Sequence, residues 1–226
     1  MELKEIIEKY QPYNKQEAKD KETMLKWMNT FDDLLTRKNE FAHFTASAWV
    51  VNPERTKVLM IYHNIYQSWA WTGGHADGEA NLKYVAEKEL QEETGITQFK
   101  VLDPSPFSLE ILTVNGHVKK GKYVSFHLHL NLTYLIEAKE TESLQINQKE
   151  NSDVCWMDIE EVEKKSTEEW IKTKIYRKLK EKEKEKEEKR RKKTKRRKRR
   201  ERKGTPFFSL GKISLFRFVH IGKEFS

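Results

Sequence analysis

The chain has 226 residues, enough for one ordinary domain with extensions. Its formal net charge is +8, but residues 177–203 hold nineteen Lys and Arg against six Glu, whereas the remainder holds 25 basic and 30 acidic residues. The basic balance therefore comes from one segment and does not indicate nucleic-acid binding by the whole protein. A single cysteine excludes an intramolecular disulfide, the N-terminal residues are charged, and no run approaches the ~18 apolar residues of a membrane span. We expect a cytoplasmic protein without a membrane span.

Residues 1–38 predict an N-terminal helical extension. Apolar residues recur there at helical spacing before Pro12 interrupts the pattern: Leu3, Ile6, Ile7 and Tyr10. A second apolar face runs from about residue 15 to 35 and contains Met24, Trp27, Met28, Phe31 and Leu35. Such faces are typical of packing surfaces, so we expect them to dock on the rest of the chain or on a second copy in a homodimer.

Residues 39–176 alternate strand-like and helical segments. The strand-like segments are residues 44–52, 57–63, 68–74, 98–103, 109–118, 123–138 and 153–159. A helix is expected between the third and fourth strands, and another from about residue 160. Cys155 falls within the last strand, where a small buried hydrophobic residue is the ordinary interpretation.

Three glutamates mark the first of these helices. Glu89, Glu92 and Glu93 stand at i, i+3 and i+4 and share one helical face, where like charges repel. A divalent cation such as Mg²⁺ turns that repulsion into coordination, because it takes oxygen ligands. The alternative is a solvated acidic face, which is the common meaning of a charge run. Gly95 suits the position that follows the helix, and an apolar stripe indicates packing on a core: Leu82, Val85, Ala86 and Leu90.

This segment resembles the Nudix box, whose pattern is G-x5-E-x7-R-E-U-x-E-E-x-G-U, with U a bulky aliphatic residue. Gly74 matches the opening glycine, and the second half matches in register through Glu89, Leu90, Glu92, Glu93, Gly95 and Ile96. Two positions depart from the pattern. Ala80 replaces the first glutamate, with Glu79 one residue early, and Lys88 replaces the arginine. The GGHADGE opening is similar to that of a Nudix subgroup in which the first glutamate is also absent.

The resemblance implies an α/β fold, a Nudix-type α/β/α sandwich around a mixed sheet. The Nudix domain would span residues 39–179, with the box at 74–96, and a low-complexity basic tail would follow at 180–226. The family uses Mg²⁺, or Mn²⁺, to cleave a diphosphate linkage, here in a nucleoside-diphosphate-linked substrate.

The resemblance also implies roles for individual residues. Glu92 and Glu93 would be metal ligands, Glu89 a ligand or the base that activates water, and Lys88 a cation that orients a box glutamate. The family often adds an acidic ligand or base in the loop before the last strand, for which Glu150 is the first candidate and Asp153 the second. Either acid would otherwise be an ordinary exposed loop residue.

Histidines supply further candidates for contact with substrate. Strand alternation places His127 and His129 on one face, where they could donate to phosphate or orient a metal ligand. Gly74 and His75, in the turn before the box helix, complete the predicted substrate-binding set. The ordinary interpretation is that these histidines are satisfied structural residues, and His43 is expected to pack.

Other functions stay open at this point. The chain could be a Nudix-fold binding or regulatory module without catalysis. An isopentenyl-diphosphate isomerase shares the fold but needs a cysteine near the site, for which Cys155 is poorly placed. The segment from Lys189 to Lys203 should be disordered when unbound. It could bind RNA, DNA or an anionic membrane, act as a nuclear-type address, or have no selected function, because its codons are compatible with a purine-rich tract or a shifted reading frame.

Overall fold

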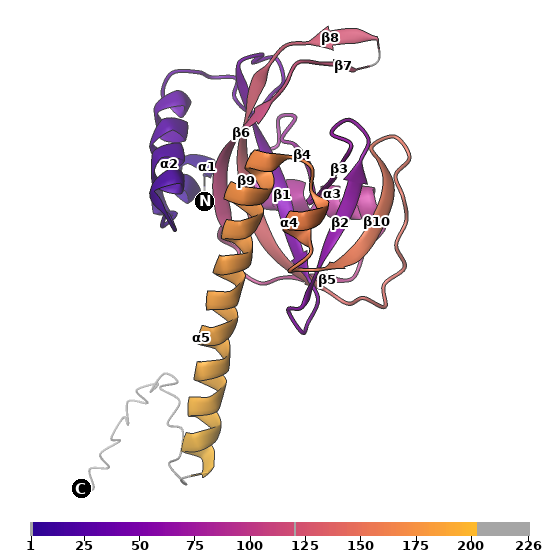
Figure 1. The fold of residues 1–226 in the computed structure, drawn as a ribbon. Helices are drawn as coiled ribbons and strands as arrows, with labels where there is room; N and C mark the ends of the chain where they lie inside the picture. Colours follow the sequence, from indigo (N-terminus) through magenta and orange to yellow (C-terminus); the bar gives the residue numbers. More distant parts are fainter. Residues whose placement is uncertain (1, 120, 203–226) are drawn as a thin grey trace, which may run out of the picture. The chain divides into compact units, whose positions relative to one another are not determined.

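A computed structural model describes residues 2–119 and 121–202 (Figure 1). Contacts within the chain divide it into two units, Met1–Glu187 and Glu188–Ser226. The first unit holds the mixed sheet, the N-terminal helices, the cavities and the sequence-predicted site residues. The following paragraphs concern this unit unless stated otherwise.

The sheet is built around one parallel strand pair, β1 (Ala42–Val51) and β9 (His127–Ala138). Its main path runs β10-β2-β1-β9-β5, with β2 at Lys57–His63, β5 at Phe99–Val101 and β10 at Asn151–Asp158. Three further strands pair with β2, β1 and β9 respectively: β3 (Ser68–Ala70), β4 (Thr72–His75) and β6 (Ser108–Val114). All pairs except β1–β9 are antiparallel, which confirms the expected mixed sheet.

A small hairpin shortens the longest expected strand. Residues 123–138 were expected to form one strand, but the sheet strand β9 begins at His127. The residues before it pair instead with the end of the preceding segment, as β7 (His117–Lys119) and β8 (Lys122–Val124). The hairpin includes Gly121 at φ 75°, a left-handed conformation that glycine adopts without steric cost.

Side chains alternate between the two faces of β1 and β9. One face is apolar along its length and shares a hydrophobic cluster with the stripe of α3 (Leu82–Thr94); its β1 residues are Phe44, Ala46, Ala48 and Val50. The other face changes character along the strands. Its paired residues are polar at one end, His43↔His129, Thr45↔Asn131 and Ser47↔Thr133, and apolar at the other, Trp49↔Leu135. The polar end provides one wall of the cavity described below.

The N-terminal extension packs against its own chain. It forms α1 (Leu3–Lys9) and α2 (Lys15–Met28), whose Ile7 and Met24 are fully buried in the main hydrophobic cluster. Polar bonds attach α2 to β6: the Ser108 hydroxyl donates to Glu17 at 2.9 Å, and the Ile111 amide donates to Asp20 at 3.1 Å. The extension is therefore continuous with the domain in packing and hydrogen bonding.

Four charged residues, three of them buried, link this extension to the last helix. We call Glu17, Glu110, Lys178 and Lys182 the paired cluster. Lys178 Nζ lies 2.9 Å from Glu110 and 3.1 Å from Glu17, and Lys182 Nζ lies 3.1 Å from Glu17. Tyr10 donates its hydroxyl to Glu17 at 2.7 Å. Three elements, α2, β6 and α5 (Arg177–Arg202), are thus held together by opposite charges.

The last helix follows α4 (Val162–Lys165) and the π-helical turn η1 (Ile171–Tyr176). Its first turns belong to the domain, since Leu179 is fully buried and Glu183 accepts from Arg55 at 2.7 Å. The contact division accordingly falls after Glu187, beyond the expected tail boundary at residue 180.

The structure also continues the helix to Arg202, where the sequence predicts disorder from Lys189 onward. Lys and Glu at i,i+4 support a helix, as Lys192 does with Glu188 at 3.5 Å. The remainder of the expected tail, residues 203–226, lies outside the described residues. Among the described helices, none has both the length and the apolar character needed to cross a bilayer.

Candidate active site

The box helix α3 is held at both ends by specific residues. Asn81 accepts a hydrogen bond from the Tyr84 amide at 3.3 Å and caps the N-terminus. Gly95 ends the helix at φ 75°, which confirms its expected position after the last turn. The apolar stripe is buried as predicted: Leu82, Val85, Ala86 and Leu90. Its glutamates are therefore presented from a helix fixed at both ends and along one face.

Each box glutamate has a different environment. Glu93 is buried, and its carboxylate accepts a hydrogen bond from the Gly73 amide at 2.9 Å. Glu89 reaches the turn that precedes the helix, where a Cβ on Gly74 would overlap the Glu89 carboxyl group. Glu92 has a half-exposed side chain. A side chain at position 74 would therefore displace the Glu89 carboxyl group.

Burial and mutual repulsion change how these carboxyl groups titrate. Burial raises the pKa of Glu89 to about 7; Lys88 opposes the shift, while Glu150 and Glu92 increase it. Burial also holds the pKa of Glu93 well above its ordinary value, against the Gly73 hydrogen bond and with help from Glu89. We call Glu89, Glu92, Glu93 and Glu150 the acidic cluster. A bound cation would stabilise the ionised carboxylates and so oppose both shifts, as expected of a metal site.

Lys88 contacts the acidic cluster from outside. Its Nζ lies 3.1 Å from Glu92 and 3.8 Å from Glu89, and 46% of its side chain is exposed. The position that has arginine in the Nudix pattern is therefore occupied by a cation that contacts two box glutamates. Lysine does so as a point charge, without the planar fork of a guanidinium.

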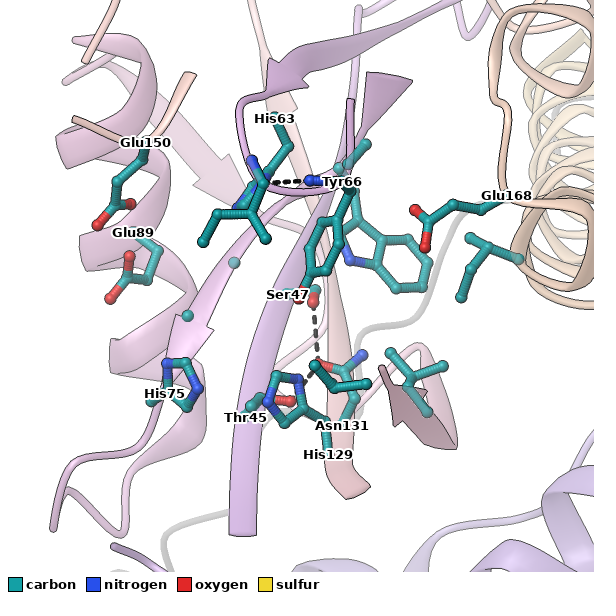
Figure 2. A pocket seen from close by; sticks show the side chains of 18 of the residues that line it. Thr45, Ser47, His63, Tyr66, His75, Glu89, His129, Asn131, Glu150 and Glu168 are labelled. Atoms are coloured by element: carbon teal, nitrogen blue, oxygen red, sulfur yellow. Dashed lines mark hydrogen bonds between the residues drawn. The ribbon is translucent and has the colours of Figure 1, made fainter. Parts of the chain in front are cut away.

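A cavity of about 580 Å³ adjoins the helix (Figure 2). The predicted residues that line it are Gly74, His75, Glu89, His129 and Glu150. Figure 2 shows Glu89 and Glu150 together on one side and Glu168 on the opposite side. The polar end of the sheet contributes Thr45, Ser47 and Asn131, and both hydroxyls donate to the Asn131 side-chain oxygen, at 3.0 and 2.9 Å.

Cations and aromatic rings also line this cavity. Arg37, Lys119 and Lys149 supply positive charge at its wall. The aromatic residues come from three elements or loops: Tyr66, Trp71 and Tyr176. The Tyr66 ring stacks on His63 with centroids 4.4 Å apart, and the Trp71 ring meets Tyr176 edge-on at 5.2 Å. The cavity therefore combines acidic, basic and aromatic walls.

The structure separates the other predicted residues from this cavity. His127 lines a neighbouring cavity of about 370 Å³, which shares His75 and His129 with the first. Glu92, Glu93 and Lys88 are not among the lining residues of either cavity. The altered box positions also lie outside them: Glu79 caps the Asn81 amide at 2.7 Å, and Ala80 is exposed. The replaced glutamate position therefore does not contribute to the cavity wall.

Several lining residues have no counterpart among the sequence-based candidates. His43 is buried, as expected, but it lies within β1 instead of ahead of the first strand, and it lines the smaller cavity. Arg37 comes from the segment after α2 and forms a two-bond ion pair with Asp77, at 2.8 and 2.7 Å. Tyr66 and Glu168 come from loops. The alternation of polar and apolar residues along 43–47 could have placed His43 on the same strand face as Thr45 and Ser47. The loop residues belong to no such pattern.

The site and the sheet together define a Nudix-type domain, in which a glycine turn and a glutamate-bearing helix adjoin a mixed sheet. The family model for the NUDIX domain matches residues 42–179, which is more than half of the chain. The chain belongs to the Nudix family. A comparison with curated proteins gives no match.

Solved structures give distant similarities. An Ap4A hydrolase binary complex from C. elegans is 18% identical, with 62% of this chain and 93% of that chain covered and a TM-score of 0.45. The Nudix hydrolase RenU from M. smegmatis is 16% identical over 62% and 84%, with a TM-score of 0.44. The NUDIX domain of Shewanella oneidensis NrtR complexed with ADP ribose is 16% identical over 62% and 86%, with a TM-score of 0.41. The family assignment rests on the family model.

Proposed function

We propose that this protein is a divalent-metal-dependent hydrolase of phosphoric anhydride bonds, acting on a nucleoside diphosphate linked to a second group. The observation that carries the proposal is the environment of Glu89. Its carboxyl group is largely buried at the wall of a cavity and repelled by other glutamates, and its pKa is raised to about 7. A protein has little structural reason to gather buried like charges, and a cation provides one.

The chemistry of the donor set fits Mg²⁺ or Mn²⁺. Carboxylate oxygens are the ligands that such hard cations take, usually together with substrate phosphates. Glu89, Glu92, Glu93 and Glu150 are the residues that would hold the metal. When bound, it would supply charge stabilisation to the phosphate oxygens and the leaving group.

The residues of the chain would divide the remaining work. Glu93, fixed by the Gly73 amide, would position the helix face toward the turn. Glu89 lies at the cavity wall, where it would hold the metal or take the proton from the attacking water. Lys88 would orient Glu92, which lies 3.1 Å away. His75 and His129, at the cavity wall, would contact the substrate phosphates, either directly or through a group that they hold.

The rest of the cavity suits a nucleotide. Arg37, Lys119 and Lys149 would offset phosphate charge, and Tyr66 or Trp71 would stack on a base or ring. At about 580 Å³ the cavity falls within the ordinary range of small-molecule sites, about 300–1,000 Å³.

The test is release of phosphate products from a panel of nucleotide sugars, dinucleotides and nucleoside triphosphates, with Mg²⁺ and Mn²⁺ compared. We expect metal-dependent hydrolysis of at least one class, lowered about 100-fold or more in Glu92→Gln. Glu79→Gln is the matched control, since Glu79 is an exposed glutamate that caps the helix away from the cavity. Wild-type protein that binds a panel member without hydrolysing it would support the binding or regulatory module instead.

The basic segment is tested separately. A truncation after Glu187 keeps the ion pairs that Lys182 and Glu183 make with the domain and removes the second unit. Unchanged hydrolysis with loss of salt-dependent RNA retention would support nucleic-acid binding by the segment from Lys189 to Lys203. Retention that is equal in both forms would exclude that role.

A further inference from the structure

Five histidines gather where β1, β4, β9 and the small hairpin meet. The His43 ring centroid lies 5.1 Å from that of His75, 5.0 Å from His127 and 5.1 Å from His129. The His75 and His129 centroids are 4.9 Å apart, and Figure 2 shows both side chains at the same end of the larger cavity. His117 extends the group toward the hairpin, 6.2 Å from His127. This group differs from the acidic cluster in chemistry and shares no residue with it.

The sheet register brings the central three together. His43 and His129 are directly paired on the parallel strands β1 and β9. His75 pairs with Thr45 from the other side of β1, so it stands diagonally beside His43. Because residues two apart share a strand face, all three rings project from the same face of adjacent strands.

Hydrogen bonds orient these rings and leave nitrogen lone pairs available. The Asn39 carbonyl accepts from His43 Nδ1 at 3.1 Å, so the deprotonated nitrogen of His43 is Nε2. Nε2 is buried and has no hydrogen-bond partner in the described part of the chain. An unsatisfied buried polar atom destabilises the fold, and a ligand at this atom would remove that cost.

A second chain of bonds fixes His127 and His129. The Ser125 carbonyl accepts from His127 Nδ1 at 2.9 Å. The Nε2 atoms of His127 and His129 lie 3.3 Å apart, so in neutral rings the Nε2–H of His129 donates to His127. That tautomer leaves Nδ1 of His129 deprotonated. Burial keeps the pKa of His43 and His129 below the ordinary value and lowers that of His75 to about 3, so these imidazoles are neutral at pH 7.

We propose that His43, His75 and His129 form a binding site for a borderline divalent transition metal of the Zn²⁺ class. Each offers one ligand nitrogen, and the three atoms lie within 4.8 Å of one another. A Zn–N distance of about 2.0–2.1 Å requires nitrogens about 3.3 Å apart around a tetrahedral ion, so binding would draw the rings inward. The carbonyl that holds His43 supplies the outer contact that metal-bound histidines usually have.

The ligand set selects the ion and leaves one position open. Neutral imidazole favours Zn²⁺, Co²⁺ or Ni²⁺ over Mg²⁺, which prefers the carboxylates of the acidic cluster. Three protein ligands leave a fourth position on a tetrahedral ion. His75 and His129 line both cavities, so that position faces the cavity space. The protein would therefore sort two kinds of cation between two neighbouring sites.

The test uses the full-length protein, freed of any affinity tag and stripped of metal, in excess Mg²⁺ to occupy the acidic cluster. Titration with Co²⁺ is followed by its visible absorption, and Zn²⁺ binding by calorimetry and by metal analysis after dialysis. We expect one equivalent of metal and an absorption spectrum typical of nitrogen ligands in a low-coordinate site. Thermal unfolding supplies a second readout, because a bound metal raises the midpoint.

Variants decide whether these histidines are the ligands. Loss of an outer contact to a metal ligand typically weakens metal binding by about 10- to 100-fold. His75→Gln and His129→Gln should weaken Zn²⁺ binding by more than this. In both variants Zn²⁺ should no longer raise the midpoint of thermal unfolding. His63→Gln is the matched control, since it lines both cavities but is not in the ligand set. Cys155→Ser controls for thiol binding. Absence of stoichiometric Zn²⁺ and Co²⁺ in wild type, or equal binding by His75→Gln and His63→Gln, would overturn the proposal.

Discussion

The paired cluster and the acidic cluster both contain buried carboxylates, but the charges around those carboxylates differ in sign. In the paired cluster burial opposes ionisation of Glu17, but Lys178 and Lys182 outweigh it and lower its pKa. In the acidic cluster burial raises the pKa of Glu93, and the neighbouring glutamates raise it further. A buried carboxylate with its own lysine is neutralised within the fold, whereas one among other carboxylates favours a cation from solution.

The largest effect is expected from removing the lysine at the centre of the paired cluster. Lys178→Met leaves Glu17 and Glu110 buried without their shared cation and should lower the free energy of unfolding by about 3–5 kcal/mol. Urea unfolding at pH 7 measures this. The control is Lys164→Met, whose pair with Glu161 has side chains 70% and 42% exposed and should contribute less than about 1 kcal/mol. Equal losses in the two variants would remove the distinction between the clusters.

The second prediction is that a substitution in the acidic cluster lowers activity without lowering stability, whereas one in the paired cluster does the reverse. Glu93→Gln should lower hydrolysis about 100-fold, or about 2.7 kcal/mol of activation free energy, by removing a metal-site carboxylate. In EDTA the same variant should be as stable as wild type or more so, because a neutral amide suits burial and can still accept from the Gly73 amide. Kinetics with Mg²⁺ and urea unfolding in EDTA provide the two measurements.

Glu17→Gln is the matched opposite. It should keep hydrolysis and lose stability, since Lys178 and Lys182 would lose the charge that offsets their own. If Glu93→Gln instead destabilised the metal-free protein and kept its activity, the acidic cluster would be structural.

The third prediction concerns pH. Glu89 has a folded pKa of about 7 against an unfolded value near 4.5, so between those values the folded state holds the proton that the unfolded state has lost. The stability of wild type in EDTA should therefore fall, through this group, as the pH rises from 4.5 to 7. Glu89→Gln lacks the group, so its stability relative to wild type should grow by about 1–3 kcal/mol over that range and stay level above it.

Urea unfolding of both proteins in EDTA at several pH values gives this difference, in which the contributions of other groups largely cancel. Mg²⁺ should reduce it, because the cation stabilises the ionised Glu89 in wild type. A difference that is constant from pH 4.5 to 7.5 would show that Glu89 is not held in a repulsive environment.

These clusters also show how far the sequence could lead. The spacing of Glu89, Glu92 and Glu93, and the turn at Gly95, are local, so the helix that carries the acidic cluster was predictable. Alternation was local too, and it placed His127 and His129 on one face, as the 3.3 Å contact between them confirms. The pairing of His43 with His129 depends on strands far apart in the chain, for which no local pattern exists. The burial of Lys178 depends likewise on α2 and β6 meeting the last helix, and its charged neighbours in sequence suggested exposure.

The smallest effect is expected at Lys88, the lysine that the structure places against the acidic cluster. Lys88 offsets the negative charge of the cluster only weakly, because nearly half of its side chain is in solvent. Its ammonium group lies 3.1 Å from Glu92 and 3.8 Å from Glu89. Lys88→Arg restores the residue of the family pattern, and a guanidinium can bond both carboxylates through a planar fork. We expect hydrolysis with Mg²⁺ to be kept or raised, by a few-fold at most, or less than about 1.4 kcal/mol. Lys83→Arg is the control, since Lys83 pairs with Glu87, a glutamate outside the acidic cluster. A large loss of rate in Lys88→Arg alone would show that Lys88 does not orient the glutamates, and that the cluster depends on a compact ammonium at that position.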